Sequence, residues 1–180
     1  MERINRIIKH KLYLEYIEKI KLHEKDRIFC KHDAVHFLDV CRLAEIEWLK
    51  QQITGTDQRS GWLLGKSDEG KENVFVDREL IYAAGLLHDI GRWQEYEQGI
   101  RHEIASSVLA PEILWECGFT ESETKEIVIA VSNHRNSEVK EEMSLSGYLY
   151  RADKKSRPCF LCEAEKECDW SREKKNLRIV

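Results

Sequence analysis

The stretch that decides the fold is Ile81–Arg92, which reads IYAAGLLHDIGR. An apolar run suited to a buried helix carries a histidine and an aspartate, His88 and Asp89, to its end. Gly91 follows and favours a helix stop, because glycine reaches positive φ without steric cost. An ionisable pair beside such a run is costly unless its charge is compensated, and imidazole and carboxylate are both good ligands for divalent cations. The stretch therefore predicts a buried helix that ends in two metal ligands.

The composition is that of an ordinary folded domain. The 180 residues are 42% hydrophobic, which is enough for one domain with its own core. The formal net charge of −4 argues against a protein that coats a nucleic acid polymer. Because no apolar run reaches the length of a membrane span and the N-terminus lacks a signal-peptide core, we expect a cytoplasmic protein without a membrane partner. In that compartment the six cysteines are expected to be thiols or metal ligands rather than a disulfide framework.

Hydrophobic residues recur at three- and four-residue steps along most of the chain, which is typical of amphipathic helices. No stretch shows the alternation of a strand, so the predicted fold class is all-α, a single-domain helical bundle over residues 1–180. In the second helix the expected apolar positions are Val35, Leu38, Leu43, Ile46 and Leu49. The first two predicted helices are residues 3–22 and 32–53, and a central helix capped by Asp77 ends at His88-Asp89. A fourth helix begins at residue 100, is restarted or kinked by Pro111 and ends at Gly118. The last two run from the capping box Thr120–Glu123 to His134 and over residues 143–155.

A polar, glycine-rich stretch, residues 54–73, interrupts this helical pattern. Its length and glycine content predict a loop rather than a regular element. The apolar segment Trp62–Leu64 inside it leaves two alternatives open. It either packs back onto the domain or covers a site.

Histidines and aspartates gather at helix ends and on apolar faces. His32 and His36 are four residues apart and are expected on one helix face, which continues through Val40 and Ala44 into buried positions. Taken singly, any such side chain is explained by a helix cap or a surface hydrogen bond. A shared metal centre explains their placement together. The ligand-type residues of this predicted centre are His36, His88, Asp89, His102, His134 and Asp153.

Three segments, in this order, resemble the HD superfamily of metal-dependent phosphohydrolases: His36–Val40, Ala84–Gly91 and Arg151–Lys154. They match the family's first histidine, its histidine-aspartate doublet and its distant aspartate. The resemblance covers residues 30–157 and implies that this core is a helical bundle of the HD-domain type. It also implies that one metal ion is bound by His36, His88, Asp89 and Asp153.

The resemblance extends to a second metal ion. His102 and His134 lie where the two-metal branches of the family have two further histidines, a layout similar to that of the symmetrically cleaving diadenosine tetraphosphate hydrolases. The glycine-tyrosine-proline signature of the cyclic-dinucleotide branch is absent, since Arg135–Ser137 follows His134. Two ions bridged by Asp89 can hold a water as hydroxide for attack on phosphorus. This donor set suits iron, manganese, cobalt or zinc.

The catalytic residues predicted for this centre are Asp89, Arg92 and His32. Arg92 stands where the family often has lysine, so the charge is kept but becomes a planar fork. For His32 two roles remain open, a neighbour that faces the substrate or the first metal ligand itself. Basic residues beside the predicted ligands favour an anionic substrate. Those expected to bind its phosphate are Arg92, Arg135, Lys154 and Arg157.

Residues 158–180 form a cysteine-containing tail beyond this core. Cys159, Cys162 and Cys168 have C-x₂-C-x₅-C spacing, and the first pair has the spacing of a metal knuckle. Cys30 is the candidate fourth ligand, because its neighbour His36 must approach Asp153 in a common metal site. The four thiols either bind a structural zinc or stay reduced, and reduced thiols are the expectation for Cys41 and Cys117.

The predicted function is a metal-dependent phosphohydrolase that cleaves a nucleotide or another small phosphate ester or anhydride with a metal-bound hydroxide. The alternative within enzymes is a mononuclear 5′-nucleotidase-like hydrolase, in which His102 and His134 bind the substrate. A non-catalytic regulatory domain that binds a metal or nucleotide, and a di-iron oxygenase on a similar fold, are alternatives of other classes. The expected partner is a small-molecule phosphate substrate, and a homodimer is open. The expected cofactor is a pair of divalent transition-metal ions.

Overall fold

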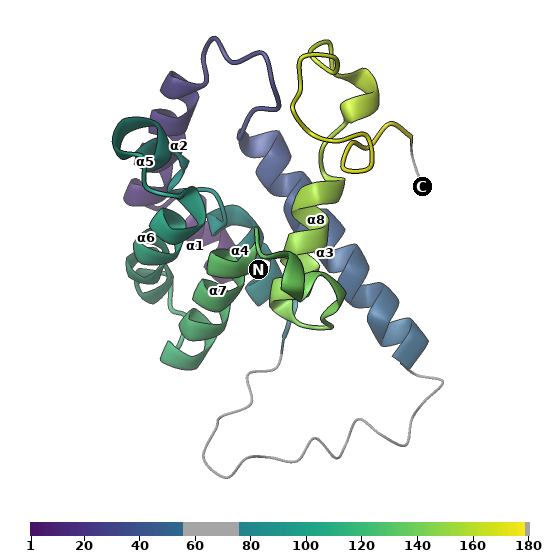
Figure 1. Ribbon diagram of the computed structural model, residues 1–180. Helices are drawn as coiled ribbons and strands as arrows, with labels where there is room; N and C mark the ends of the chain where they lie inside the picture. The colour runs from purple at the N-terminus through teal and green to yellow at the C-terminus, as the bar shows by residue number, and fades with distance from the viewer. Residues whose placement is uncertain (56–75, 179–180) are drawn as a thin grey trace.

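The computed structural model describes residues 1–55 and 76–178, and in these ranges it is a bundle of helices without a strand (Figure 1). The predicted all-α, single-domain class is therefore confirmed. None of the described helices is long and apolar enough to cross a membrane. The elements are α1 Glu2–Ile7, α2 Lys11–His23, α3 Ala34–Gly55, α4 Arg78–Leu87, α5 Arg92–Gln98, α6 His102–Glu116, α7 Glu121–Asn133, α8 Leu145–Lys155, and the 3₁₀ turns η2 Ser137–Glu141 and η3 Cys159–Leu161.

Helix α4 is the central element, in contact with α1, α3, α6, α7 and α8. Its whole length from Leu80 to Leu87 is buried except for Tyr82. The predicted cap is present, since the side chain of Asp77 accepts a hydrogen bond from the backbone N–H of Leu80 at 2.9 Å. Long α3 packs along α4 and α8, whereas α6 and α7 pack against each other on the other side (Figure 1).

Gly91 has a different role from the predicted one. The α4 helix ends at Leu87, and Gly91 has a φ of −86°, so the expected left-handed stop is wrong. A Cβ at Gly91 would lie 2.4 Å from the backbone nitrogen of Ser106 and 2.6 Å from Ala105. Only a residue without a side chain allows the His88–Asp89 turn to pass this close to α6.

The N-terminal segment, predicted as one helix over residues 3–22, is broken into α1 and α2. The break occurs at His10, whose ring accepts a hydrogen bond from the backbone N–H of Leu12 and so caps α2. Because the chain turns there, Ile4 and Ile7 of α1 and Ile20 of α2 can all be buried.

Helix α3 buries only part of what the sequence predicts, since Val40 and Ala44 are buried as expected but most of the other predicted apolar positions are not. Val35, Leu38, Ile46 and Leu49 are exposed, so the prediction that they form the apolar face is wrong. The helix instead turns Phe37, Val40, Cys41 and Ala44 into the core, where a Cβ at Gly85 of α4 would lie 2.6 Å from Cys41 Sγ. This close contact between helices decides which face is buried.

Other predicted boundaries agree with the structure or shift slightly. Thr120 and Glu123 form the predicted capping box of α7, and Gly118, at φ 90°, ends the preceding segment. Helix α6 is a single element that contains Pro111 and does not restart there, whereas α5 was not predicted. Helix α3 runs through Gly55, and the rest of the predicted loop, with Trp62–Leu64, lies outside the described residues.

Candidate metal centre

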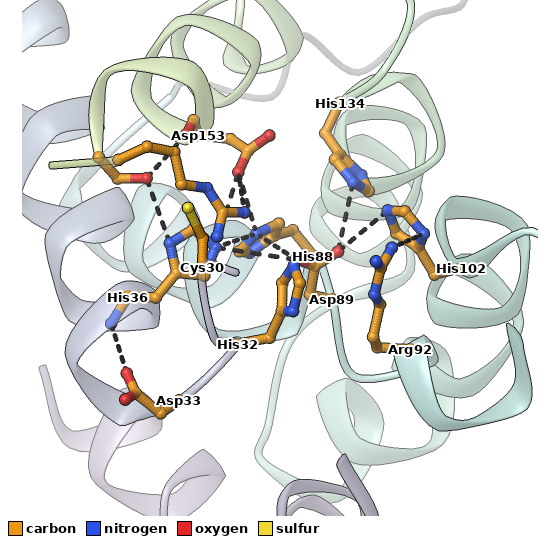
Figure 2. Close-up of polar contacts among 12 residues, drawn as sticks. Cys30, His32, Asp33, His36, His88, Asp89, Arg92, His102, His134 and Asp153 are labelled. Carbon is orange, nitrogen blue, oxygen red and sulfur yellow. Dashed lines mark hydrogen bonds and ion pairs between the residues drawn. The ribbon is translucent and has the colours of Figure 1, made fainter. Parts of the chain in front are cut away.

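The end of α4 places His88 and Asp89 in the interior. His88 is the C-terminal cap of the helix and has no exposed side-chain surface, and Asp89 follows at 2% exposure. Ligand-type side chains from α3, α6, α7 and α8 converge on this point (Figure 2). The six ligands predicted from the sequence are brought together by the fold.

One group of four lies around the Oδ2 atom of Asp89. His88 Nε2 is 3.2 Å and His36 Nε2 is 3.8 Å from this oxygen, and the two nitrogens are 3.3 Å apart. Asp153 Oδ1 from α8 is 3.6 Å from His36 Nε2 and 3.8 Å from His88 Nε2. All four residues are buried, and one ligand atom from each lies within 4.8 Å of the others. The four ligand atoms are therefore close enough together to bind one metal ion.

A second group lies around the other oxygen of the same carboxylate. Asp89 Oδ1 is 3.3 Å from His102 Nε2, at the start of α6, and 3.4 Å from His134 Nε2, at the end of α7. Figure 2 shows these two rings on the side of Asp89 opposite His36 and Asp153. Asp89 thus faces two separate sets of ligand atoms, one with each oxygen.

The outer nitrogen of each ring has a partner that fixes the ring. Nδ1 of His88 lies 2.8 Å from the Gly85 carbonyl, Nδ1 of His134 lies 2.6 Å from the Val131 carbonyl, and Nδ1 of His102 lies 2.5 Å from a Glu95 oxygen. Ser156 Oγ, which donates to the Asp153 carbonyl, is left to accept from Nδ1 of His36 at 3.2 Å. In His36, His88 and His134 the partner of Nδ1 is an acceptor, so Nε2 is the nitrogen left to bind a metal ion, as in metal-binding histidines. Nδ1 of His102 has a second neighbour, Arg92 Nη1 at 2.7 Å.

The protonation states fit a cation at this centre. Burial lowers the pKa of His36 and of His102 to about 4, so both rings are neutral near pH 7. Burial opposes the ionisation of Asp89, but His88 and its neighbours hold the pKa of this carboxyl well below its usual range. Asp89 Oδ1 is buried and accepts no hydrogen bond from the described residues. Burial lowers the pKa of His88, but Asp89 and Asp153 outweigh it and raise it. A buried carboxylate among imidazole rings needs positive charge beside it, which a bound metal ion can supply.

The comparison with protein families agrees with this geometry. The HD domain model matches residues 34–166, from the second residue before His36 to beyond Asp153. The chain belongs to the HD domain family. It is also 36% identical, over 99% of both chains, to an uncharacterized protein of Clostridium beijerinckii. No solved structure matches. HD domain proteins are generally metal-dependent hydrolases, and the buried histidines and aspartates of this chain can hold metal ions.

The four basic residues predicted to bind phosphate all line one cavity of this HD domain, together with His32, Asp89 and His102. Its volume is about 200 Å³. Two of the cations already hold Asp153, with Lys154 Nζ 2.6 Å and Arg157 Nη2 3.1 Å from its carboxylate oxygens. Arg92 lies beside His102 and pairs with Glu95 at 2.8 Å. Arg135 is half-exposed at the cavity, 3.7 Å from Glu103.

His32 reaches the centre of the HD domain by an unexpected route. It does not share a helix face with His36, because α3 begins at Ala34 and the side chain of Asp33 caps its first turn. Its ring is nevertheless buried, with Nε2 3.6 Å from Asp89 Oδ2. Nδ1 lies 2.5 Å from Glu24 Oε1 at the end of α2. His32 is not part of the group of four ligand atoms or of the group of three, so it is a neighbour of the metal centre.

Sequence reasoning missed the residues that orient the rings. Glu24, Glu95 and Ser156 lie in no motif, and their partners are distant in the chain or on another element. The carbonyls of Gly85 and Val131 had a signal. Each lies three residues before a histidine at a helix end, where the last carbonyls lack a helical partner.

The cysteines of the tail lie at the same cavity. All six cysteines are free thiols, and Cys41 in α3 and Cys117 at the C-terminal cap of α6 are buried, as expected for reduced thiols. The other four line the cavity beside Asp153 and Arg157, although no three of their sulfur atoms lie within 4.8 Å of one another. These four are Cys30, Cys159, Cys162 and Cys168.

Proposed function

We propose that this chain is a metal-dependent phosphohydrolase that uses two ions to cleave a nucleotide or another small phosphate ester or anhydride. The observation that carries the proposal is the position of Asp89, whose two oxygens each face a separate set of ligand atoms. His36, His88 and Asp153 would complete one ion, and His102 and His134 the other. When bound, such ions supply Lewis acidity and an activated water for displacement at phosphorus.

The residues around the ligands hold the site ready for an anion. Burial raises the pKa of Asp153, but Lys154 and Arg157 outweigh it and hold the carboxyl well below its usual range. Asp153 therefore stays ionised as a ligand. Arg92 and Arg135 offer planar, forked donors to phosphate oxygens at the cavity.

His32 contributes a proton acceptor. Because Nδ1 donates to Glu24, Nε2 is the unprotonated nitrogen and faces Asp89 Oδ2 at 3.6 Å. From there it can orient a water beside the carboxylate and take its proton. This role favours the reading of His32 as a substrate-facing neighbour of the ligands.

The substrate is proposed to be small because the cavity has a volume of only about 200 Å³, and the net charge of −4 gives no general attraction for a nucleic acid polymer. Six basic and four acidic side chains line the cavity, so its lining carries a net positive charge although the chain as a whole is acidic. A small polyanion is therefore the substrate class that fits best.

The test is phosphate release from a panel of nucleotides and dinucleoside polyphosphates, with manganese, iron, cobalt or zinc supplied in turn. We expect turnover with at least one pair, and loss of at least a thousandfold in Asp89→Asn, as for removal of a group essential to the catalytic unit. Asp39→Asn is the matched control, since Asp39 is half-exposed on α3 and pairs with Arg42. Equal turnover in Asp89→Asn and the unaltered protein would reject the proposal.

A further inference from the structure

The C-terminal tail keeps its conformation almost without an apolar core. Of its described residues 158–178, only Cys159 and Ala164 are buried, and Phe160, Leu161 and Leu177 are exposed. Hydrogen bonds hold its two ends, from Phe160 N–H to the Asn176 carbonyl and from Asn176 Nδ2 to the carbonyls of Lys154 and Arg157. A segment with so little buried apolar surface generally needs a cross-link or a metal to stay folded.

Four cysteines from two distant segments line one cavity beside this tail. The backbone N–H of Cys162 donates to the Cys159 carbonyl at 3.2 Å, so η3 closes the C-x₂-C pair into one turn. Cys30, in the loop before α3, faces the same cavity, and Cys168 lines it from the next turn of the tail. Burial raises the pKa of the Cys30 thiol, and the neighbouring Cys159 and Cys162 thiols raise it further. Cys30 is therefore within electrostatic range of Cys159 and Cys162.

We propose that Cys30, Cys159, Cys162 and Cys168 bind one thiophilic divalent ion, with zinc as the natural occupant. Four thiolates fill a tetrahedral shell and leave no open position, so this ion is structural and separate from the histidine centre, with which it shares no ligand. Each thiol gives up its proton to solvent as the metal–sulfur bond forms.

Binding would contract the tail toward the loop before α3. On one tetrahedral zinc ion the sulfur atoms are about 3.8 Å apart, which follows from a Zn–S distance of about 2.3 Å. In the structure no three of the described sulfur atoms lie within 4.8 Å of one another. The ion would therefore draw Cys168 and Cys30 toward the C-x₂-C turn.

This contraction would also shape the substrate cavity, a consequence that rests on the proposed function. Glu165, Trp170 and Lys175 of the tail line the same cavity as Asp89 and Arg92. Glu165 lies between Cys162 and Cys168, and Trp170 follows Cys168 by two residues. An ion bound to the two cysteines would therefore fix this part of the wall that faces the substrate.

Metal analysis of the full chain tests the thiolate site directly. We expect Cys162→Ser and Cys168→Ser each to lose about one zinc ion per chain relative to the unaltered protein. Cys117→Ser is the matched control, because Cys117 is a buried thiol at the end of α6 and lines no part of the cavity. Unchanged zinc content in Cys162→Ser would overturn the proposal.

Cobalt substitution supplies a second, spectroscopic readout. We expect the unaltered chain and Asp89→Asn to bind Co²⁺ with the thiolate-to-cobalt charge-transfer absorption of a tetrahedral site, and Cys162→Ser to lack it. Absence of this band in the unaltered chain would overturn the proposal. Because Asp89→Asn empties the histidine centre, failure of the hydrolase proposal leaves this measurement unaffected, and the two outcomes can be told apart.

Discussion

A carboxylate oxygen of Glu24, at the end of α2, lies 2.5 Å from Nδ1 of His32, whose Nε2 lies 3.6 Å from Asp89. The second Glu24 oxygen, Oε2, accepts a hydrogen bond from the backbone N–H of His32 at 2.6 Å. The Tyr96 hydroxyl donates a hydrogen bond to Oε1 of Glu24. Burial raises the pKa of Glu24, but the hydrogen bonds from His32 and Tyr96 outweigh it and lower the pKa to about 2. An ionised Glu24 thus fixes the tautomer and the direction of the His32 ring.

Glu24→Gln is therefore expected to lower kcat about 10- to 100-fold, the usual effect of removing a carboxylate that orients a functional histidine. An amide can present its NH₂ to Nδ1, which reverses the tautomer and turns a protonated Nε2 toward Asp89. Steady-state kinetics with a fixed metal supply measures the change. Glu97→Gln is the control, since Glu97 is exposed and pairs with His23. Equal kcat values for the two variants would remove His32 from the mechanism.

Arg135→Ala is expected to raise KM about tenfold, or about 1.4 kcal/mol, while metal content stays unchanged. The reason is that Arg135 lines the cavity and its ion-pair partner is Glu103, at 3.7 Å, rather than a metal ligand. Lys140→Ala, at an exposed position of η2, is the matched control. A loss of bound metal in Arg135→Ala would show that this residue supports the centre rather than the substrate.

Gly91→Ala is expected to destabilise the fold by about 1–3 kcal/mol, the cost of forcing extra volume into a packed interior. The added Cβ meets backbone atoms of Ser106 and Ala105, which cannot rotate away. Urea unfolding measures the difference. Gly99→Ala is the comparison, because Gly99 has a φ of 70° but open space for a Cβ, and its cost is limited to about 1 kcal/mol of left-handed strain. A neutral Gly91→Ala would mean that the crossing with α6 is looser than described.

The metal-free protein is expected to lose stability as the pH falls from about 6.5 to about 4. Burial lowers the pKa of His36 and His102 to about 4 in the folded chain, whereas unfolded histidines titrate near 6.5. The unfolded chain therefore takes up protons first, and the free energy of unfolding falls by up to about 1.4 kcal/mol per pH unit for each such ring. Urea titrations of the chelated protein at several pH values measure the slope. A slope that is the same in His36→Gln would contradict this assignment.

The core of this centre could be predicted from the sequence because its ligands lie in short, ordered signals. His88 and Asp89 are adjacent at the end of an apolar run. His36 and Asp153 lie before and after it in the two other segments that resemble the HD superfamily. The orientation of the rings could not be predicted, since Glu24 and Glu95 meet their histidines only through tertiary packing. In α3 the four-residue spacing of His36, Val40 and Ala44 predicted buried positions correctly, whereas the exposure of Val35, Leu38, Ile46 and Leu49 could not be predicted from their apolar character.

Metal content, compared between the unaltered chain and Asp89→Asn, tests the central claim most directly. The two oxygens of Asp89 face separate ligand groups, so the account predicts that Asp89→Asn loses two transition-metal ions per chain and that His134→Ala loses one. Ions bound by the cysteines are common to all three proteins and cancel in the difference. Equal metal content in the unaltered chain and Asp89→Asn would contradict the account.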